Sequence, residues 1–424
     1  MTTRTTPLVG IFADDLTGAL DAAAPFAAKG FRTLVSPSIE LPVCAEFAEV
    51  ISVNLGTRHL TPTEIIDRAA AAVRALDGLG VNILLNKVDS TLRGNPGIEL
   101  YAALKTVSGD HAVICPAYPQ NGRTIEDGML LVGGIPVGDT DVGTDQLSPV
   151  RSSNVAEVIW NSLSAAGLGE QVHLRGGDGG ATVTDLLPVI IIADAKSEDD
   201  LTRLVRGKLN GVRPALIAGS AGISVAIADE MSADRMLRRG SLVEPDDRGR
   251  RIFIVTASQR TIVEEQLAVL GGSMDLVQAE LSLDEVLRGL GDEWITQMQE
   301  VASSDGVVVL KLSSLEAATN EAQDKTIGRS KTIVQNLGIA VRKITDEVKP
   351  DTLIVIGGDT ASGVIEACGV TSLELQGELQ PGTVSGVALD GSITNSLLVT
   401  RAGGFGDKHA LLELVNLMEF DRNV

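Results

Sequence analysis

The sequence has few cysteines, histidines and aromatic residues. Its three cysteines, Cys44, Cys115 and Cys368, lie far apart and form no C-x-x-C pair, which argues against a disulfide framework or a zinc site. The four histidines are scattered without the helical spacing of metal ligands, so we expect no protein-built metal site. Aromatic residues make up only 3% of the chain. The core must therefore consist of Ala, Val, Leu and Ile, as in parallel α/β sheets.

Long apolar runs are also missing. No apolar stretch approaches the roughly 20 residues of a membrane-spanning helix, and the N-terminus lacks the basic-then-apolar pattern of a secretory signal. Acidic residues outnumber basic ones by 56 to 35, a formal net charge of −21, which disfavours nucleic-acid binding. We therefore expect a cytoplasmic protein with no membrane or nucleic-acid partner. An anionic ligand would need a local cationic site that opposes the overall field.

Short apolar runs alternate with Ala-rich stretches of helical periodicity from the start of the chain. This alternation predicts an α/β fold with mostly parallel sheets and helices on both faces. At 424 residues the chain is too long for one typical core. A charged stretch with Pro and Gly marks the boundary. We predict an N-terminal α/β domain over 1–238, a linker over 239–250 and a C-terminal α/β domain over 251–424.

Two stretches depart from this alternation. Between Ala117 and Arg151 the pattern breaks, and we expect a long irregular loop, which in a compact domain usually serves function. From Pro381 onward glycine becomes frequent, and we expect a glycine-rich end that leads to a short final helix.

Carboxylates and hydroxyls follow the first predicted strand. Asp14, Asp15 and Thr17 come directly after the apolar run Leu8–Phe12, and in open α/β sheets ligands bind where strands end. One of these residues can cap the helix that follows, but a single cap does not account for both aspartates. We predict that one of the aspartates contacts substrate, where a carboxylate can orient a hydroxyl and accept its proton.

A denser polar cluster follows the strand predicted over Val81–Leu85. It comprises Lys87, Asp89, Ser90, Thr91, Arg93 and Asn95. A solvated turn is the alternative, but charges that follow directly on a buried strand need partners. A guanidinium can bind a carboxylate through two parallel hydrogen bonds, which an ammonium cannot. We predict that Arg93 binds the carboxylate of a small polyhydroxylated anion, with Asp89 and Ser90 on its hydroxyls.

A third polar stretch, at 115–124, follows the next predicted strand. It is rich in turn-forming residues, so a rigid surface loop is one interpretation. The other is a second anion contact through Arg123, with Asn121 beside it. The residues favour neither interpretation over the other.

Three predicted strand ends of the C-terminal half are rich in glycine or hydroxyl groups. They carry Ser258, then Gly357, Gly358, Asp359 and Thr360, and finally Gly403 and Gly404. Adjacent glycines let backbone N–H groups approach a phosphate, and a helix N-terminus favours its negative charge. None of these stretches matches G-x-x-x-x-G-K-[ST] or G-x-G-x-x-G. Each is a weak signal alone, but together they predict a nucleotide site.

Taken together, the motifs resemble the four-carbon acid sugar kinase family. The resemblance spans nearly the whole chain and rests on A-D-D-L-T-G-A at 13–19, K-V-D-S-T-L-R-G-N at 87–95, C-P-A-Y-P-Q-N-G-R-T at 115–124, S-P-V-R at 148–151, Ser258, G-G-D-T at 357–360 and G-G-F-G-D at 403–407. It implies an N-terminal domain that binds the sugar acid. It also implies a C-terminal domain that binds ATP through Ser258, the Gly357–Thr360 turn and Gly403-Gly404.

The resemblance further implies transfer of phosphate from ATP, which carries the Mg²⁺, to the 4-hydroxyl of a tetronate. The D-S-T-L-R-G-N and G-G-D-T forms favour D-threonate or D-erythronate as substrate, with 3-oxo-tetronate as the alternative. In the mechanism we expect, Arg93 binds the carboxylate, helped by Lys87 or Arg123. One of Asp14, Asp15 and Asp89 accepts the hydroxyl proton.

Two functions of other classes compete with this interpretation. A sugar-acid dehydrogenase is disfavoured because the dinucleotide fingerprint G-x-G-x-x-G is missing. A non-catalytic two-lobe sensor of sugar acids is disfavoured by the nucleotide-like turns of the second half. The sequence leaves open the stereoisomer, the catalytic base and the oligomeric state, with a homodimer as one alternative.

Overall fold

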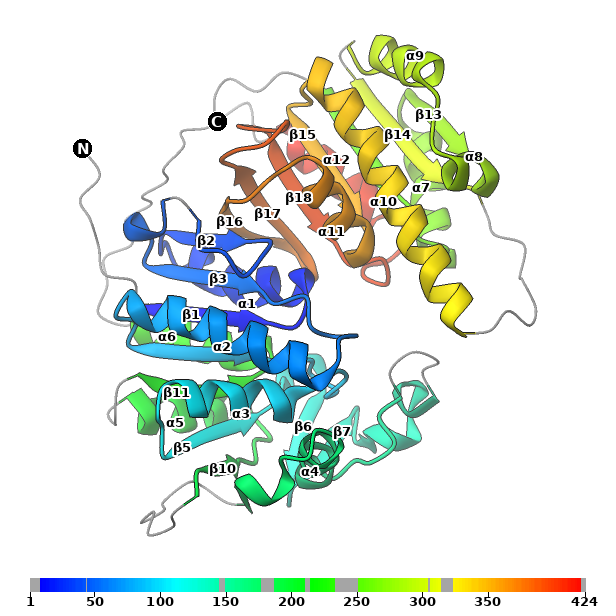
Figure 1. Cartoon of the computed structure of the whole chain (residues 1–424). Helices are drawn as coiled ribbons and strands as arrows, with labels where there is room; N and C mark the ends of the chain where they lie inside the picture. Colours follow the sequence, from blue (N-terminus) through cyan, green and yellow to red (C-terminus); the bar gives the residue numbers. More distant parts are fainter. Residues whose placement is uncertain are drawn as a thin grey trace. The chain divides into compact units, whose positions relative to one another are not determined.

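The computed structural model describes residues 8–42, 44–144, 149–176, 187–209, 214–232, 251–303, 306–313 and 323–420. The chain divides into two compact units, Met1–Gly240 and Ser241–Val424 (Figure 1). The predicted linker, 239–250, lies outside the described residues. No helix within the described ranges combines the length and the apolar character needed to cross a membrane.

The main sheet of the first unit is parallel, and its topology reverses at the first strand. Its members are β1 (Val9–Ala13), β2 (Thr33–Ser36), β3 (Val50–Asn54), β4 (Ile83–Lys87), β5 (His111–Cys115), β9 (His173–Gly176), β10 (Val189–Ile192) and β11 (Ala215–Gly219), in the order β2-β3-β1-β4-β11-β5-β10-β9. After β1 the chain builds β2 and β3 on one side and then β4 on the other. In open α/β sheets ligands bind at such a reversal, outside the carboxyl ends of the strands.

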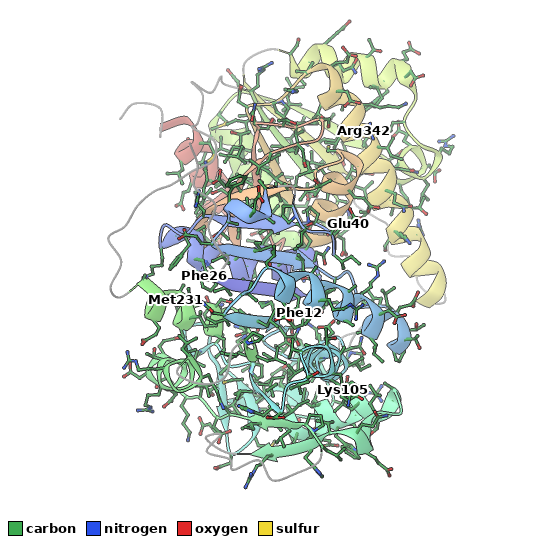
Figure 2. All side chains as sticks on the ribbon, turned by 60° about the vertical axis from the view of Figure 1, so that its left-hand side comes forward. Phe12, Phe26, Glu40, Lys105, Met231 and Arg342 are labelled. Carbon is green, nitrogen blue, oxygen red and sulfur yellow. The ribbon has the colours of Figure 1, made fainter. Side chains whose placement is uncertain are left out.

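Helices cover both faces of this sheet, as the alternating pattern predicts. They are α1 (Leu16–Ala28), α2 (Pro62–Gly78), α3 (Pro96–Thr106), α4 (Val155–Ala165), α5 (Glu198–Leu209) and α6 (Ala221–Ser232), with short 3₁₀ turns at Ala45–Phe47, Pro119–Asn121, Val137–Asp139, Asp141–Thr144 and Gly169–Gln171. Helices α2, α3 and α4 pack in one row, and α1, α6 and α5 pack in another (Figure 1). Phe12 and Phe26 are fully buried between the layers, whereas Glu40 and Lys105 lie at the surface (Figure 2).

The expectation of an irregular loop between Ala117 and Arg151 is wrong for part of that stretch. It contains a small antiparallel sheet of β6 (Arg123–Glu126), β7 (Met129–Val132) and β8 (Ile135–Pro136). Two-residue turns at Asp127-Gly128 and Gly133-Gly134, all with positive φ, join these strands. Asp-Gly and Gly-Gly are typical of such hairpin turns, so the glycines that suggested irregularity are the turns of a meander.

The second unit also has a mostly parallel sheet, extended by an antiparallel hairpin. Its strands are β12 (Arg251–Thr256), β13 (Leu276–Leu281), β14 (Gly306–Leu312), β15 (Thr352–Ile356), β16 (Leu373–Gln380), β17 (Thr383–Ala388) and β18 (Leu397–Arg401), in the order β13-β14-β12-β15-β18-β17-β16. The pairs from β13 to β18 are parallel, and β17 pairs antiparallel with both β16 and β18. The topology reverses at β12, because β14 lies on one side of it and β15 on the other.

The glycine-rich end predicted from Pro381 onward contains two strands, β17 and β18. Gly386 lies within β17, where an added Cβ would come 2.9 Å from the carbonyl oxygen of Glu374 on β16. This glycine allows close packing inside the sheet and does not interrupt it. The final helix is present as α12 (Ala410–Phe420).

The remaining helices of this unit are α7 (Thr261–Ser273), α8 (Leu283–Arg288), α9 (Asp292–Ala302), α10 (Gln323–Glu347) and α11 (Gly358–Ala367). Helices α10 and α11 cross at glycines. A Cβ added to Gly338 of α10 would lie 2.4 Å from the carbonyl oxygen of Gly363 on α11. Because α11 begins at the turn that holds Gly357 and Thr360, this crossing also positions a predicted part of the nucleotide site.

We expect Gly338→Ala to lower the free energy of unfolding by about 1–3 kcal/mol, because the added methyl group meets rigid backbone. Gly328→Ala on the same helix is the matched control. An added Cβ there has no neighbour within 4 Å, and the change should raise the free energy of unfolding by up to about 1 kcal/mol. Urea unfolding of both variants measures the two effects. Equal effects would contradict the close crossing of α10 and α11.

Candidate functional site

Three strand ends with polar side chains meet at the reversal of the first sheet. Ala13, the last residue of β1, lies opposite Asn54 of β3 and Lys87 of β4. The polar stretches that follow these strands are therefore neighbours at one edge of the sheet. Two of them, after β1 and β4, carry the predicted site residues. The third, after β3, supplies Arg58, to which the sequence analysis gave no role.

Arg58 forms the centre of a cluster with the two predicted aspartates. Its Nε and Nη2 atoms donate to the two carboxylate oxygens of Asp14 at 2.7 and 3.0 Å, and its Nη1 lies 2.5 Å from Oδ2 of Asp15. The other oxygen of Asp15 caps α1 by accepting from the backbone N–H of Gly18 at 2.6 Å. Asp15 therefore has the capping role that the sequence allowed, together with an ion pair that the sequence did not reveal.

A second ion pair joins the residues that follow β4. The guanidinium of Arg93 donates to both carboxylate oxygens of Asp89, at 3.2 and 2.8 Å. The Thr91 backbone N–H donates to Oδ1 of Asp89 at 3.0 Å, and the Thr91 hydroxyl donates to the same atom. The aspartate thereby fixes the direction of the arginine that we predict to bind the substrate carboxylate.

The other predicted residues of this cluster lie around the same edge. Lys87 is the last residue of β4 and is buried, with its Nζ 3.6 Å from Oδ2 of Asp21 on α1. Thr17 lies in the first turn of α1, and Ser90 lies in the turn between Asp89 and Arg93, each half-buried. The expectation that charges placed after a buried strand need partners is met for Lys87.

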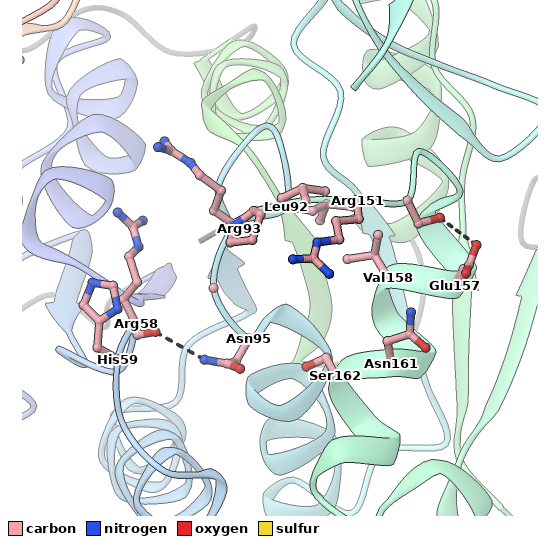
Figure 3. Close-up of a pocket in the computed structure, with 14 residues that line it drawn as sticks. Arg58, His59, Leu92, Arg93, Asn95, Arg151, Glu157, Val158, Asn161 and Ser162 are labelled. Carbon is pink, nitrogen blue, oxygen red and sulfur yellow. Dashed lines mark hydrogen bonds between the residues drawn. The ribbon is translucent and has the colours of Figure 1, made fainter. Parts of the chain in front are cut away.

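Arg58 and Arg93 line a pocket of about 590 Å³ together with a third arginine, Arg151 (Figure 3). The lining comes from the loops after β3 and β4, the segment 149–152 and helix α4; its other members are His59, Leu92, Gly94, Asn95, Pro149, Val150, Ser152, Glu157, Val158, Asn161 and Ser162. The side chain of Arg151 lies between the 92–95 segment and α4 (Figure 3), and it has no ion pair among the described residues. In a chain with a net charge of −21, three guanidinium groups at one pocket make a local anion site.

Burial and charge act in opposite directions on the two aspartates. Burial raises the pKa of Asp14, and the positive charge of Arg58 offsets part of that rise. Burial also acts to raise the pKa of Asp89, but the hydrogen bonds and charge of Arg93 and the hydrogen bond from Thr91 outweigh it, so this pKa lies well below its usual range. Asp89 is therefore an ionised carboxylate committed to Arg93, which suits it to hold the arginine more than to accept a proton.

Asn121 and Arg123 are not among the residues that line this pocket. Asn121 ends a 3₁₀ turn and Arg123 begins β6, and the Arg123 guanidinium donates to the backbone oxygen of Asn121. The Nε atom of Arg123 is buried and has no hydrogen-bond partner in the described part of the chain. A role for these two residues in binding substrate stays a prediction.

The predicted nucleotide residues of the second unit also converge on one sheet edge. Thr256 of β12 lies opposite Ile356 of β15, which lies opposite Arg401 of β18. The loops that follow carry Ser258, the Gly357–Thr360 turn and Gly403-Gly404. They come together at the reversal of this sheet, where ligands bind in open α/β folds.

The loops at this edge approach each other too closely for a side chain at Gly403 or Gly404. A Cβ on Gly403 would lie 2.8 Å from Oγ of Ser258, and one on Gly404 would lie 2.9 Å from Nη1 of Arg260. Gly357 has a φ of 109° and precedes α11, so it adopts a conformation that residues with a side chain rarely take. Backbone N–H groups, a hydroxyl and a guanidinium are thus exposed to a ligand at one helix N-terminus, which suits phosphate groups.

Two buried side chains hold the 403–407 loop in this position. Nη2 of Arg401 donates to the carbonyl oxygen of Phe405 at 2.8 Å, and Nε2 of Gln266 donates to the carbonyl oxygens of Phe405 and Asp407 at 3.1 and 2.8 Å. Nη1 of Arg401 is buried without a hydrogen-bond partner in the described part of the chain. In the neighbouring Gly357–Thr360 turn, Thr360 is buried and Asp359 is exposed.

In the described ranges, no three His, Cys, Asp or Glu side chains are grouped as metal ligands. Of the three pocket arginines, Arg58 and Arg151 are the two to which sequence reasoning gave no role. Arg58 follows β3 as Asp14 follows β1, so the strand-end argument could have found it. Arg151 lies in the S-P-V-R motif, whose first residue, Ser148, is outside the described residues.

Comparison with known proteins matches the two halves of the chain separately. Residues 9–227 match the family described as a sugar-binding N-terminal domain, and residues 253–411 match a nucleotide-binding C-terminal domain. A D-threonate kinase of Bordetella bronchiseptica is 29% identical, over 96% of both chains. A D-erythronate kinase of Heliobacterium modesticaldum is 27% identical over 97% of both chains. A 3-oxo-tetronate kinase of Burkholderia multivorans is 26% identical over 94% of this chain and 95% of that protein.

The fold has close counterparts among solved structures. A Haemophilus influenzae protein superposes with a TM-score of 0.72 at 20% identity, covering 96% of this chain and 99% of that one. A Salmonella typhimurium protein titled a putative tRNA synthase gives a TM-score of 0.73, also at 20% identity, over 96% of this chain and 98% of that one. At this identity the likeness shows a shared fold.

We expect Arg58→Ala to lower the free energy of unfolding by about 3 kcal/mol at pH 7, because Asp14 would remain buried without its cation. The loss should shrink as the pH falls toward 5, where the unpaired carboxyl can take up a proton. Arg206→Ala is the control. It removes an exposed ion pair with Glu230 and should cost less than about 1 kcal/mol. Urea unfolding at both pH values measures the difference, and equal losses would show that the Arg58 cluster contributes no more than a surface pair.

Proposed function

We propose that this chain is an ATP-dependent sugar-acid kinase. It belongs to the family that joins a sugar-binding N-terminal domain to a nucleotide-binding C-terminal domain. Its substrate is a four-carbon acid, D-threonate or D-erythronate, which it phosphorylates on the 4-hydroxyl. Relatives that match along nearly the full chain are named for these activities. Because the reaction uses ATP, we propose that the protein acts in the cytoplasm.

The observation that carries the proposal is the pocket with Arg58, Arg93 and Arg151 on its wall. A sugar acid has one carboxylate and several hydroxyls, and guanidinium groups bind carboxylates through paired, charge-assisted hydrogen bonds. Asn95, Asn161 and Ser162 on the same wall offer amide and hydroxyl groups that can both donate to and accept from sugar hydroxyls. The pocket thus has the composition that a small polyhydroxylated anion requires.

In the reaction we propose, Arg93 and Arg151 hold the substrate carboxylate, and the aspartates act around the 4-hydroxyl. Asp15 is the candidate base, because its side chain is 29% exposed, against 6% for Asp14 and 14% for Asp89. Ser258, the Gly357–Thr360 turn and Gly403-Gly404 hold ATP. When bound, ATP supplies the phosphoryl group, with Mg²⁺ on its phosphates. Such transfer depends mainly on positioning and on neutralising charge.

Coupled ADP release with Mg-ATP tests the proposal against a panel of D- and L-threonate, D- and L-erythronate and 3-oxo-tetronate. We expect turnover with D-threonate or D-erythronate, and none without Mg²⁺. Turnover with 3-oxo-tetronate alone would assign the chain to the activity named for the Burkholderia relative. ATP binding without turnover of any panel acid would support the nucleotide site and point to another sugar acid as the substrate. The absence of both ATP binding and turnover would contradict the proposed function.

Arg151→Ala should raise the KM for the acid substrate tenfold to a hundredfold, roughly the loss expected for one charge-assisted hydrogen-bond pair. The KM for ATP should stay within about threefold, because the nucleotide residues lie in the other unit. Arg74→Ala, an exposed arginine of α2 outside the pocket, is the control for loss of one positive charge. Equal KM values for the acid in the two variants would remove Arg151 from the binding site.

Asp15→Asn separates the chemical role of Asp15 from its structural role. Asparagine caps a helix as well as aspartate does, and Arg58 keeps its ion pair with Asp14, so the unfolding midpoint should change little. It cannot accept the hydroxyl proton, and kcat should fall by about a hundredfold or more. Steady-state kinetics and thermal unfolding of the same preparation measure both effects. A kcat within threefold of the unmodified protein would exclude Asp15 as the base and return the role to Asp14 or Asp89.

A further inference from the structure

Glu99 is a carboxyl group buried beneath the candidate site, and the mechanism above does not use it. It lies in the first turn of α3 and is 1% exposed. Its Oε1 accepts from the hydroxyl of Thr57 at 2.5 Å, and its Oε2 accepts from the side-chain amide of Asn86 at 3.2 Å. Glu99 forms no ion pair with a cation among the described residues, in contrast to the aspartates of this site.

The two partners of Glu99 lie on the strand ends that build the site. Thr57 directly precedes Arg58, and its backbone N–H donates to the carbonyl oxygen of Asp14 at 2.9 Å. Asn86 precedes Lys87 at the end of β4. Glu99 therefore links α3 to the loop after β3 and to β4. Through Thr57 it supports the backbone from which Arg58 reaches the pocket.

A second connection ties the same helix to Arg58. The side chain of Asn95, which precedes α3, donates to the carbonyl oxygen of Arg58 at 3.4 Å (Figure 3). Arg58 is thus attached to α3 on both sides, through Thr57 and Glu99 and through Asn95. Its guanidinium is fixed separately by Asp14 and Asp15.

We propose that Glu99, as a neutral carboxyl group, is a positioning residue that fixes Thr57 and Asn86 and so keeps Arg58 at the sugar-acid pocket. The expected changes in KM rest on the proposed function, whereas the expected changes in stability do not depend on it. A neutral carboxyl group has both a donor and an acceptor, so it can serve either orientation of the Asn86 amide. The buried Oδ1 of Asn86 has no partner in the orientation found, within the described part of the chain.

The charges around Glu99 account for its neutrality. Burial and the negative charge of Asp14 raise the pKa of Glu99 to about 8, while the hydrogen bonds of Thr57 and Asn86 and the charge of Arg58 act to lower it. Asp15 and Lys87 act on the same cluster through Asp14. If Glu99 lost its proton, a further negative charge would lie close to Arg58 and weaken the attraction of the pocket for an anionic substrate.

Two substitutions separate a neutral from an ionised Glu99. Glu99→Gln keeps a neutral side chain with one acceptor for Thr57, and its amide can donate to the unpartnered Oδ1 of Asn86 once the Asn86 amide turns over. Its KM for the acid at pH 7 should stay within about threefold. Glu99→Ala removes both hydrogen bonds, and its KM for the acid should rise tenfold or more with a smaller change in the KM for ATP. Loss of acid binding in Glu99→Gln equal to that in Glu99→Ala would overturn the inference.

The pH profile is a readout that a packing role alone would not move. In the unmodified protein the KM for the acid should rise as the pH passes about 8, because Glu99 then ionises. Glu99→Gln has no proton to lose, so its profile should lack this rise. The same alkaline rise in both proteins would show that another group titrates.

Unfolding tests the neutral carboxyl without any reference to activity. In the folded protein Glu99 holds its proton more tightly than in the unfolded chain, where a Glu side chain titrates near its usual pKa of about 4.3. Its stabilising contribution is therefore complete below that pKa and is lost progressively as the pH rises toward about 8. The urea midpoint of the unmodified protein should fall relative to that of Glu99→Gln between pH 5 and pH 8. Parallel midpoints would overturn the inference even if a panel acid is turned over. Diverging midpoints with no turnover would support the inference and contradict only the proposed function.

Discussion

The pairing of buried carboxylates with arginines is the interaction on which the candidate site depends. In this acidic chain, carboxylates hold guanidinium groups at one pocket, where we propose that the anionic substrate binds. Asp14 and Asp15 fix Arg58, and Asp89 fixes Arg93. Removing one partner of such a pair would leave an uncompensated charge at low exposure. The pairs therefore hold two of the arginines at the pocket wall and also constrain the strand ends that carry them.

The second unit reaches an anion-binding surface by a different route. Its predicted site has few charged groups and relies on backbone N–H groups, glycines and a helix N-terminus at the reversal of the sheet. Arg401 and Gln266 act there from beneath the loop, through the carbonyl oxygens of Phe405 and Asp407. The two units thus share the strand order around the reversal of the sheet, and we propose that each binds its ligand there. They differ in whether side-chain charge or backbone geometry binds the anion.

Local patterns predicted much of this architecture. The α/β alternation, the parallel sheets and most helices follow from periodicity, since buried parallel strands are continuous apolar runs and the helices between them are rich in Ala. The β6–β8 meander and the β16–β17 hairpin were missed, because glycine in hairpin turns and in tightly packed strands looks the same in a sequence as glycine in a loop. Whether a glycine lies in a hairpin turn, in a packed strand or in a loop depends on its position within the sheet and not on the local composition.

The candidate site was predictable in part for a related reason. Asp14, Asp89 and Arg93 follow predicted strands, so their gathering at one edge needed only the rule for parallel sheets. The partner of each charge was not predictable, because it depends on strand order. Arg58 meets Asp14 only because β3 lies beside β1, and Glu99 meets Thr57 only because α3 packs beneath the same edge. Pairing with an arginine affects how readily an aspartate accepts a proton. The motifs alone do not show which aspartates are paired.

The most direct test of the central claim, that the arginine-lined pocket binds the carboxylate of a four-carbon acid, is isothermal titration calorimetry of the acid beside its alcohol. Threitol and erythritol keep the four-carbon chain and hydroxyls of D-threonate and D-erythronate but have no carboxylate. The account predicts that one of the two acids binds at least tenfold more tightly than its alcohol. Equal affinity for acid and alcohol, or no binding of either acid, would contradict it.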